Sequence, residues 1–300
     1  MQRGQMPGTQ ARLHKGVLKA SKYLILRRIS QIALLALFVA GPWFGYWIVK
    51  GNLASSLTLD VLPLSDPLVL LQSLFAGQLP LKSAFIGAGI VLLFYLLVGG
   101  RVYCSWVCPI NIVSDTTEWL RDRFNLKGGA RFSRNARYWL LAAILLLSAI
   151  TGSIAWELVN PVSMVYRGLI FGMGMAWGVV LGIFLLDLLV ARNAWCGHLC
   201  PVGAFYGLLG EAAVLRVSAA NRHNCDDCMD CFAVCPESQV IKPALKGADK
   251  NIGPVITSGK CTNCGRCIDV CDRDVFHFTT RFSNQIPESA GTHKQREVSS

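Results

Sequence analysis

The sequence predicts an α-helical membrane protein with four transmembrane helices, followed by a small α+β domain rich in cysteine. Three observations lead to this prediction. Of the 300 residues, 53% are hydrophobic and only 16% are charged, whereas soluble domains carry about a quarter charged residues. The uncharged residues gather in intervals of similar length, and twelve cysteines recur at regular spacings. The chain therefore has too few charges to cover a water-facing surface of its size.

Uncharged, strongly apolar residues form four intervals in the first two thirds of the chain: 29–49, 83–100, 138–156 and 168–186. Each interval is 18–21 residues long, close to the roughly 20 residues with which a helix crosses about 30 Å of hydrocarbon. The alternative, that one or two are buried core helices, does not explain four intervals of nearly equal length. Residues 67–81 are shorter and contain two prolines, so we interpret them as an interfacial segment. Residues 193–210 contain a proline and several glycines and are interpreted as a turn with a short helix.

The distribution of basic residues predicts the orientation in the membrane. Seven basic residues precede residue 29 and seven lie in 101–137, but only two lie in 50–82 and one in 157–167. This contrast places both termini in the cytoplasm of a multi-pass protein of the bacterial inner membrane. Residues 1–28 are then a basic tail and 29–210 the membrane domain. Because basic residues at these places set topology and meet anionic lipid headgroups, the net charge of +11 does not indicate a nucleic-acid partner.

Eight cysteines form two identical runs, Cys225-x2-Cys228-x2-Cys231-x3-Cys235 and Cys261-x2-Cys264-x2-Cys267-x3-Cys271. This is the spacing of bacterial ferredoxins, in which three cysteines of one run and the last cysteine of the other hold one [4Fe–4S] cluster. We therefore assign the first cluster to Cys225, Cys228, Cys231 and Cys271, and the second to Cys261, Cys264, Cys267 and Cys235. Two complete four-cysteine runs disfavour structural zinc. The pattern predicts a ferredoxin-like 2[4Fe–4S] domain over residues 216–282, with a disordered tail over 283–300.

The other four cysteines form two aromatic-Cys-x3-Cys-Pro motifs, at 103–109 and 195–201, and both cysteines of the first recur 92 residues later. Each motif follows the second helix of a two-helix pair, which indicates a duplicated unit related by an axis along the membrane normal. Three interpretations stay open: a shared metal or third iron–sulfur centre, a dithiol–disulfide pair, or small buried residues at helix ends. The matched aromatic and proline positions favour the first two over the third. The thiols concerned are those of Cys104, Cys108, Cys196 and Cys200.

Together these features resemble the NapH family, the ferredoxin-type membrane components of quinol dehydrogenases that serve periplasmic nitrate reductase. Residues 51–60, 99–109 and 195–201 carry the resemblance most specifically, and it extends over roughly residues 25–280. It implies quinol as the substrate and a NapG-like periplasmic ferredoxin-type partner. It further implies a route to a NapC-like cytochrome and the nitrate reductase complex.

A second function stays open, because relatives with this membrane core include methylamine-utilisation proteins of similar size. In that case the chain is a membrane iron–sulfur factor that assembles, matures or maintains a partner redox enzyme. Either way we expect an electron-transfer component rather than a standalone enzyme, because the sequence contains no nucleotide-binding glycine motif and no phosphate loop. The predicted orientation puts the clusters in the cytoplasm, on the side opposite to a periplasmic acceptor.

Quinol oxidation also needs a proton acceptor, and ionisable residues near the membrane are the candidates. Asp187 lies nine residues before Cys196, and Glu157 marks the outer end of the third predicted helix. For both, a solvated charge at a helix end is the simpler interpretation. His198 lies inside the second motif, and histidine exchanges protons near neutral pH. We therefore expect His198 and the four motif thiols to flank a site where electrons pass between the membrane domain and the clusters.

Overall fold

The computed structural model describes residues 6–283 except 125, 127, 131 and 173, and these fall into two units. The helical unit comprises Lys22–Ala213 and Ser258–Cys264. The cysteine-rich unit comprises the described residues of 1–21, 214–257 and 265–300. This division differs from the predicted domains at two places. The first 21 residues belong to the cysteine-rich unit, and the loop 258–264 belongs to the helical unit.

Two repeats with the same order of elements make up most of the helical unit. The first contains α2 (Lys22–Phe44), α3 (Pro67–Phe75), α4 (Lys82–Val98), the π-helical turn η2 (Tyr103–Val107) and α5 (Ile110–Arg123). The second contains α6 (Ala136–Thr151), α7 (Pro161–Phe171), α8 (Gly174–Leu185) with its π-helical extension η4 (Leu186–Val190), the π-helical turn η5 (Trp195–Leu199) and α9 (Pro201–Glu211). A short 3-10 turn, η3 (Trp156–Leu158), precedes α7. Each repeat is therefore larger than the two-helix unit expected from the cysteine spacing.

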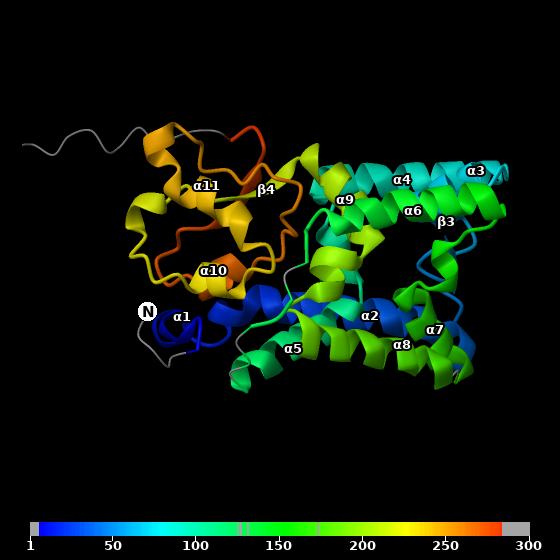
Figure 1. Ribbon diagram of the computed structural model, residues 1–300, viewed down its shortest axis with the longest axis horizontal. Coiled ribbons are helices and arrows are strands. Elements are labelled where there is room, and N and C mark those ends of the chain that lie inside the picture. Colours follow the sequence, from blue (N-terminus) through cyan, green and yellow to red (C-terminus); the bar gives the residue numbers. More distant parts are fainter. Residues whose placement is uncertain (1–5, 125, 127, 131, 173, 284–300) are drawn as a thin grey trace, which may run out of the picture. The chain divides into compact units, whose positions relative to one another are not determined.

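The helices of this unit lie in two layers, and each layer takes elements from both repeats (Figure 1). One layer holds α3, α4, α6 and α9, and the other holds α2, α5, α7 and α8. The helix that follows each cysteine motif packs on the helix that precedes the other motif, α5 on α8 and α9 on α4. The turns η2 and η5 are the places where the chain crosses between layers. This crossing brings the two motifs into the same region.

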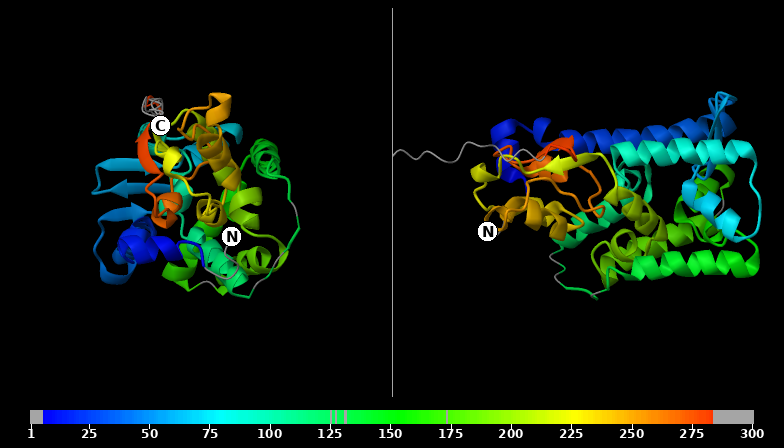
Figure 2. Two further views of the ribbon diagram at one scale, coloured as in Figure 1. Left: turned by 90° about the vertical axis from the view of Figure 1, so that its left-hand side faces the viewer. Right: turned by 90° about the horizontal axis from the view of Figure 1, so that it is seen from above.

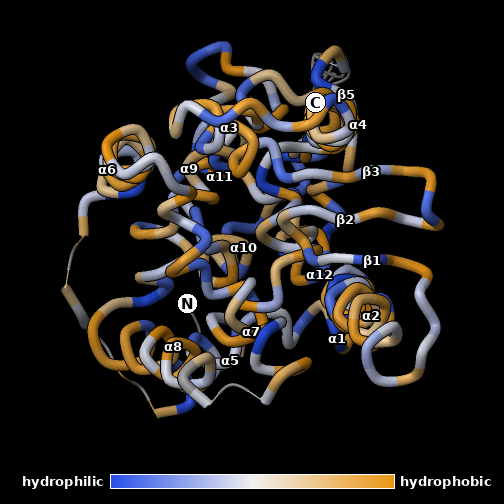
Figure 3. The backbone as a smooth tube through the Cα atoms, turned by 90° about the vertical axis from the view of Figure 1, so that its right-hand side faces the viewer, coloured by the Kyte–Doolittle hydropathy of each residue, from blue (hydrophilic) through white to orange (hydrophobic). Residues whose placement is uncertain are grey.

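Apolar residues run along α4, α6 and α8 (Figure 3). Among the described residues, Lys19–Phe44 is the one helical segment long and apolar enough to cross a membrane. The apolar helices Lys82–Val98, Ala136–Thr151 and Ala176–Val190 are shorter, at 10–17 residues. Four membrane crossings therefore remain a prediction.

The predicted interval 168–186 is not one helix, and this part of the prediction is wrong. Gly172 ends α7 with a φ of 65°, in the left-handed region that glycine adopts at little cost. The interval 138–156 likewise ends early, because Gly152 terminates α6 with a φ of 64°. Counting uncharged residues does not detect such breaks, since glycine is as uncharged as its neighbours.

The short helices α3 and α7 begin with the same kind of cap. Asp66 Oδ1 accepts a hydrogen bond from Leu68 N at 2.9 Å, and Asn160 Oδ1 accepts one from Val162 N at 3.1 Å. Proline occupies the first position of each helix, where its missing N–H is not needed. The segment 67–81, predicted as interfacial, thus contains a capped helix.

A small antiparallel sheet precedes α3 and was not predicted. Its strands are β1 (Val49–Gly51), β2 (Ser55–Thr58) and β3 (Leu62–Ser65), in the order β1-β2-β3. Val49 pairs with Thr58, and Ser56 pairs with Leu64. Figure 2 shows these strands at the side of the helical unit.

The cysteine-rich unit is a small α+β fold. Strands β4 (Leu215–Ser218) and β5 (His277–Thr280) pair antiparallel. Between them lie α10 (Asp230–Val234), α11 (Ile241–Lys246) and α12 (Arg266–Val270), with the 3-10 turns η6 (Arg222–Asn224), η7 (Ser238–Val240) and η8 (Ala248–Lys250). The predicted tail 283–300 lies outside the described residues from residue 284 onward.

The described residues of the predicted basic tail 1–28 include a segment that packs on the cysteine-rich unit. Helix α1 (Thr9–Lys15) and the 3-10 turn η1 (Lys19–Ser21) pack on α12, and Ala11 is fully buried. Gly8 N donates to Asp230 Oδ2 at 2.7 Å, and Lys15 Nζ donates to the carbonyl oxygen of Cys271 and pairs with Asp274. Basic composition alone did not reveal these contacts, because their partners lie more than 200 residues away.

Candidate redox sites

Four of the predicted cluster ligands surround one cavity in the cysteine-rich unit. Cys225, Cys228, Cys231 and Cys271 line it, and its volume with the open mouth is about 370 Å³. The ligands of a cuboidal cluster encircle a space, because each iron corner takes one thiolate. Within the described residues, no three His, Cys, Asp or Glu side chains converge as the ligands of a single metal ion would. The encircling arrangement fits a [4Fe–4S] cluster.

Both cysteine runs use the same backbone turns around their second cysteine. In the first run, Asp227 and Met229 have φ of 61° and 66°; in the second, Asn263 and Gly265 have φ of 47° and 74°. Such left-handed residues on both sides of the cysteine curl the chain tightly. The loop geometry that wraps a cluster is therefore present in both runs.

Burial in the cavity favours neutral thiols. Burial raises the pKa of the Cys231 thiol to about 12 and that of the Cys228 thiol to about 11. Iron binds the thiolate, so cluster binding has to release these protons. Bound iron would then supply positive charge that stabilises the thiolates.

The ligands predicted for the second cluster are divided between the units. Cys261 and Cys264 belong to the loop in the helical unit, whereas Cys235 and Cys267 belong to the cysteine-rich unit.

The two Cys-x3-Cys motifs fold into the same π-helical turn. Cys108 N donates to the carbonyl oxygen of Tyr103 at 3.0 Å, and Cys200 N donates to that of Trp195 at 2.9 Å. These bonds span five residues, as in a π-helix, and such turns are frequent at functional sites. The proline that ends each motif precedes or begins the next helix, so that the chain turns immediately after the second cysteine.

The four motif thiols pack on two buried cores, and Cys108 packs on both. Cys104, Cys108 and Cys200 pack on a core that contains Tyr103 and Trp156. Cys108 and Cys196 pack on a second core. The four cysteines are free thiols, and within the described residues they do not converge as the ligands of a single metal ion would. Thiol redox chemistry and a third iron–sulfur centre are the interpretations that stay open.

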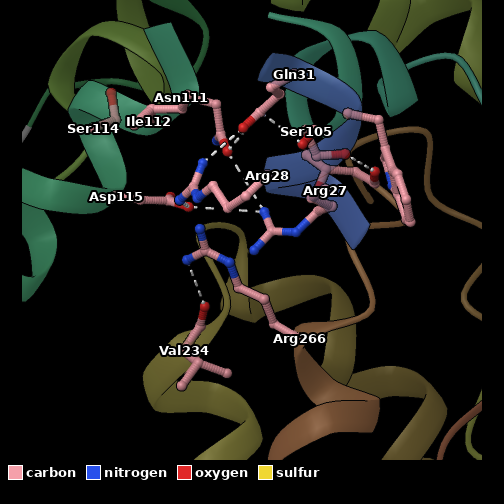
Figure 4. A network of polar contacts seen from close by, with 12 residues as sticks. Arg27, Arg28, Gln31, Ser105, Asn111, Ile112, Ser114, Asp115, Val234 and Arg266 are labelled. Carbon is pink, nitrogen blue, oxygen red and sulfur yellow. Dashed lines mark hydrogen bonds and ion pairs between the residues drawn. The ribbon is translucent and has the colours of Figure 1, made fainter. Parts of the chain in front are cut away.

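The first helix of each repeat holds the backbone of a motif. Gln31, fully buried on α2, donates to the carbonyl oxygens of Ser105 at 3.0 Å and Cys108 at 3.2 Å (Figure 4). An Arg28–Asp115 ion pair and a 2.8 Å hydrogen bond from Arg28 to Gln31 fix this arrangement. In the second repeat, Arg137 on α6 donates to the carbonyl oxygen of Gly197 at 3.4 Å, which is the position equivalent to Ser105.

Asp187 is fully buried, so its interpretation as a solvated charge is wrong. Its Oδ2 accepts a 2.6 Å hydrogen bond from Ser114 Oγ, and its Oδ1 accepts one from Trp195 N at 2.9 Å. Ser114 Oγ also lies 3.3 Å from Cys196 Sγ. Since the single hydroxyl hydrogen of Ser114 is donated to Asp187, the thiol of Cys196 is the donor to Ser114. A hydrogen-bonded chain thus runs from Cys196 through Ser114 to Asp187.

The other two predicted proton acceptors have different surroundings. His198 Nδ1 lies 3.4 Å from the carbonyl oxygen of Asn193, and its ring faces Phe132. Glu157 is half-buried, and its Oε2 accepts from Asn160 Nδ2 at 3.2 Å. The polar partner of His198 is therefore a backbone carbonyl and not a motif thiol.

Ser114, which connects the carboxylate of Asp187 to the thiol of Cys196, was not predicted from the sequence. Its position, six residues after Cys108 on the helix that follows the motif, gave no signal of this role. A serine in a polar helix is common, and its partner Asp187 is 73 residues away in the sequence. The chain of hydrogen bonds becomes visible only when α5 packs on α8 and η4.

Family models match both cysteine-containing regions. A model described as a 4Fe-4S binding domain matches residues 82–127 and again residues 173–218, which contain η2 and η5. A second model, described as a 4Fe-4S dicluster domain, matches residues 224–275. The repeated match agrees with the duplication in the fold.

Three relatives are similar over nearly their whole length. MauN of Paracoccus denitrificans (strain Pd 1222), a methylamine utilization ferredoxin-type protein, is 57% identical over 91% of this chain and 95% of its own. MauN of Methylorubrum extorquens is 54% identical over 89% and 92% of the two chains. The ferredoxin-type protein NapH of Escherichia coli (strain K12) is 49% identical over 92% and 96%. No solved structure matches the chain.

Proposed function

The chain belongs to the family of ferredoxin-type proteins that includes NapH and MauN, and we propose that it is the membrane subunit of a quinol dehydrogenase. The family predicted from the motifs is therefore confirmed. The 4Fe–4S family models make the chain an iron–sulfur electron-transfer protein. The proposal adds the substrate, the membrane topology and the electron acceptor.

The hydrogen-bonded chain from Cys196 to Asp187 is the observation that carries the proposal. Oxidation of a quinol to a quinone releases two electrons and two protons. When bound, two [4Fe–4S] clusters would accept electrons singly, without taking up the protons. The protons need an acceptor on the protein, and Asp187 is buried within two hydrogen bonds of a motif thiol. A candidate proton acceptor thus lies next to one of the motif thiols.

The eight cysteines of the two runs hold the two clusters in this proposal. Cys225, Cys228, Cys231 and Cys271 would bind the first cluster, as their shared cavity supports. Cys261, Cys264, Cys267 and Cys235 would bind the second cluster. Cys104, Cys108, Cys196 and Cys200 would form the additional metal-binding or thiol redox site of the membrane domain.

The proposed topology has four membrane crossings, by α2, α4, α6 and α8 with η4, and both termini in the cytoplasm. Seven basic residues on each of the two inner segments support it, against two and one outside. Reporters fused after residue 300, one active only in the cytoplasm and one only in the periplasm, test the side. Activity of the periplasmic reporter alone would overturn this orientation.

Two acceptor systems are candidates for the proposed electron route. The resemblance to NapH supports a route through a NapG-like periplasmic subunit and a NapC-like cytochrome to nitrate reductase. The higher identity to MauN, 57% and 54% against 49% for NapH, favours a methylamine-utilisation system. In that system the chain would deliver electrons, or would assemble or maintain a partner redox enzyme.

Cluster reduction in native membranes separates electron delivery from maintenance. We expect added quinol to reduce the clusters, observed by electron paramagnetic resonance, within the time of turnover. Dithionite provides the total reducible signal as a control. Clusters that a soluble cytoplasmic donor reduces, and quinol does not, would contradict the quinol dehydrogenase and support the maintenance role.

A further inference from the structure

The loop 258–264 is fastened to the first cysteine motif by side chains of that motif. Ser105 Oγ donates to the carbonyl oxygen of Thr262 at 2.8 Å, and Trp106 Nε1 donates to that of Asn263 at 3.1 Å. Arg101 Nη1 donates to the carbonyl oxygen of Lys260 at 2.8 Å. All these residues belong to the helical unit. Two donors of the motif, together with Arg101 two residues before it, therefore hold the segment that carries Cys261 and Cys264.

The backbone of the same loop also packs directly on α9 and on the turn after α4. A Cβ atom on Gly259 would lie 2.2 Å from the carbonyl oxygen of Gly207, too close for any other residue. Gly99 has a φ of 122°, and a Cβ there would lie 2.5 Å from the side-chain nitrogen of Asn263. That nitrogen donates to the carbonyl oxygen of Val98 at 3.2 Å. Glycines at these positions allow an approach that side chains would prevent.

We propose that Ser105, Trp106 and Arg101 are positioning residues for the second cluster, and that this cluster is the one that exchanges electrons with the membrane domain. The inference rests on the proposed function, with quinol as the reductant. It concerns the transfer of single electrons, without making or breaking a covalent bond. One connection runs from Cys104 to Ser105, across one hydrogen bond to Thr262, and on to the adjacent Cys261.

The second motif lacks these donors, which makes the attachment specific to the first motif. At the positions equivalent to Ser105 and Trp106, 92 residues later, stand Gly197 and His198. Gly197 has no side chain to donate a hydrogen bond. His198 Nδ1 lies 3.4 Å from the carbonyl oxygen of Asn193, two residues before the turn η5. The first motif therefore offers the direct connection to the second cysteine run.

Hydrogen exchange of the full chain with its clusters tests the positioning role without any need for quinol. Trp106→Phe and Ser105→Ala each remove one donor, and loss of one hydrogen bond should speed exchange of residues 258–264 by about two- to tenfold. Residues 224–231, the loop of the first cluster, should be unchanged. The matched control is Trp119→Phe, at a tryptophan on α5 that is 57% exposed. Equal acceleration of both loops, or of neither, would contradict the proposal.

Removal of one cluster at a time tests the order of electron transfer. In Cys264→Ser we expect dithionite, but not quinol, to reduce the first cluster, whereas Cys228→Ser should keep quinol reduction of the second. Quinol reduction of the first cluster in Cys264→Ser would overturn the proposal. If Cys264→Ser holds no cluster, Trp106→Phe decides: it should slow quinol reduction relative to Trp119→Phe, and an unchanged rate would overturn the proposal. Lack of quinol reduction in the unaltered protein would instead contradict the proposed function.

Discussion

The two repeats of the helical unit have the same fold and different polar partners. In the first, Ser105 and Trp106 donate to the loop of the second cysteine run. In the second, Cys196 is connected to the buried Asp187 through Ser114 of α5, a residue of the first repeat. Duplication provided two equivalent thiol turns, and sequence divergence gave one a connection toward the clusters and the other a connection to an acid. The first motif is therefore linked to the loop of the second cysteine run, and the second motif to a carboxylate.

Equivalent positions next to the two motifs make this divergence clear. A shift of 92 residues relates Asp187 to Tyr95 and Tyr206 to Ser114. Where α9 packs on α4, Tyr95 and Tyr206 form an edge-to-face contact with ring centroids 4.9 Å apart. Where α5 packs on α8 and η4, Ser114 donates a 2.6 Å hydrogen bond to Asp187. The same packing of one helix on another thus holds an aromatic pair on one side and a proton-accepting pair on the other.

Replacement of one thiol in each repeat should have the largest effect. We expect Cys104→Ser and Cys196→Ser each to slow quinol-driven cluster reduction by about a hundredfold or more, because a serine hydroxyl replaces neither a metal-binding thiolate nor a redox-active thiol. Stopped-flow spectroscopy of the membrane protein measures the rate, and dithionite reduction should be unchanged. An unchanged quinol rate in either variant would remove its motif from the electron route.

Asp187→Asn should affect proton release while leaving the electron route in place. Loss of a general base typically slows a reaction by about 10²- to 10⁴-fold, and we expect a fall near the lower end. The rate should recover in part at high pH, where hydroxide and buffer bases replace the carboxylate. Quinol oxidation measured across pH, with dithionite reduction as the control, checks this. A variant with the unaltered pH profile would show that Asp187 is structural.

The cysteine pattern could be predicted from the sequence because chemistry fixes the spacing of cluster ligands. Cys225, Cys228, Cys231 and Cys271 were assigned together and line one cavity. The break at Gly172 was not predicted, since composition does not record a left-handed backbone. Nor was the bond from Trp106 to Asn263, whose partners are 157 residues apart. Local spacing reports local chemistry, and contacts between distant segments depend on the packing of the two layers.

Ser114→Ala should have a smaller effect than the loss of the acid, because water can replace a missing hydroxyl in a polar site. We expect quinol oxidation to fall by about tenfold, the equivalent of one hydrogen bond to a charged group. Tyr206→Phe is the matched control, since it removes a hydroxyl from the equivalent position of the other repeat. It should leave the rate within about twofold. Equal losses in the two variants would show that the repeats do not differ in this way.

Lys15→Met should have the smallest effect of these substitutions, a shift in the reduction potential of one cluster. Lys15 belongs to the cysteine-rich unit and not to either repeat. The ammonium group of Lys15 donates to the carbonyl oxygen of Cys271, a ligand proposed for the first cluster. A nearby positive charge stabilises the reduced, more negative state, so its removal should lower the potential of the first cluster by roughly 20–60 mV. Redox titration followed by electron paramagnetic resonance measures this shift. Because this hydrogen bond goes to a ligand proposed for the first cluster, the potential of the second cluster should stay the same. An equal shift of both potentials would show that Lys15 does not tune the first cluster separately.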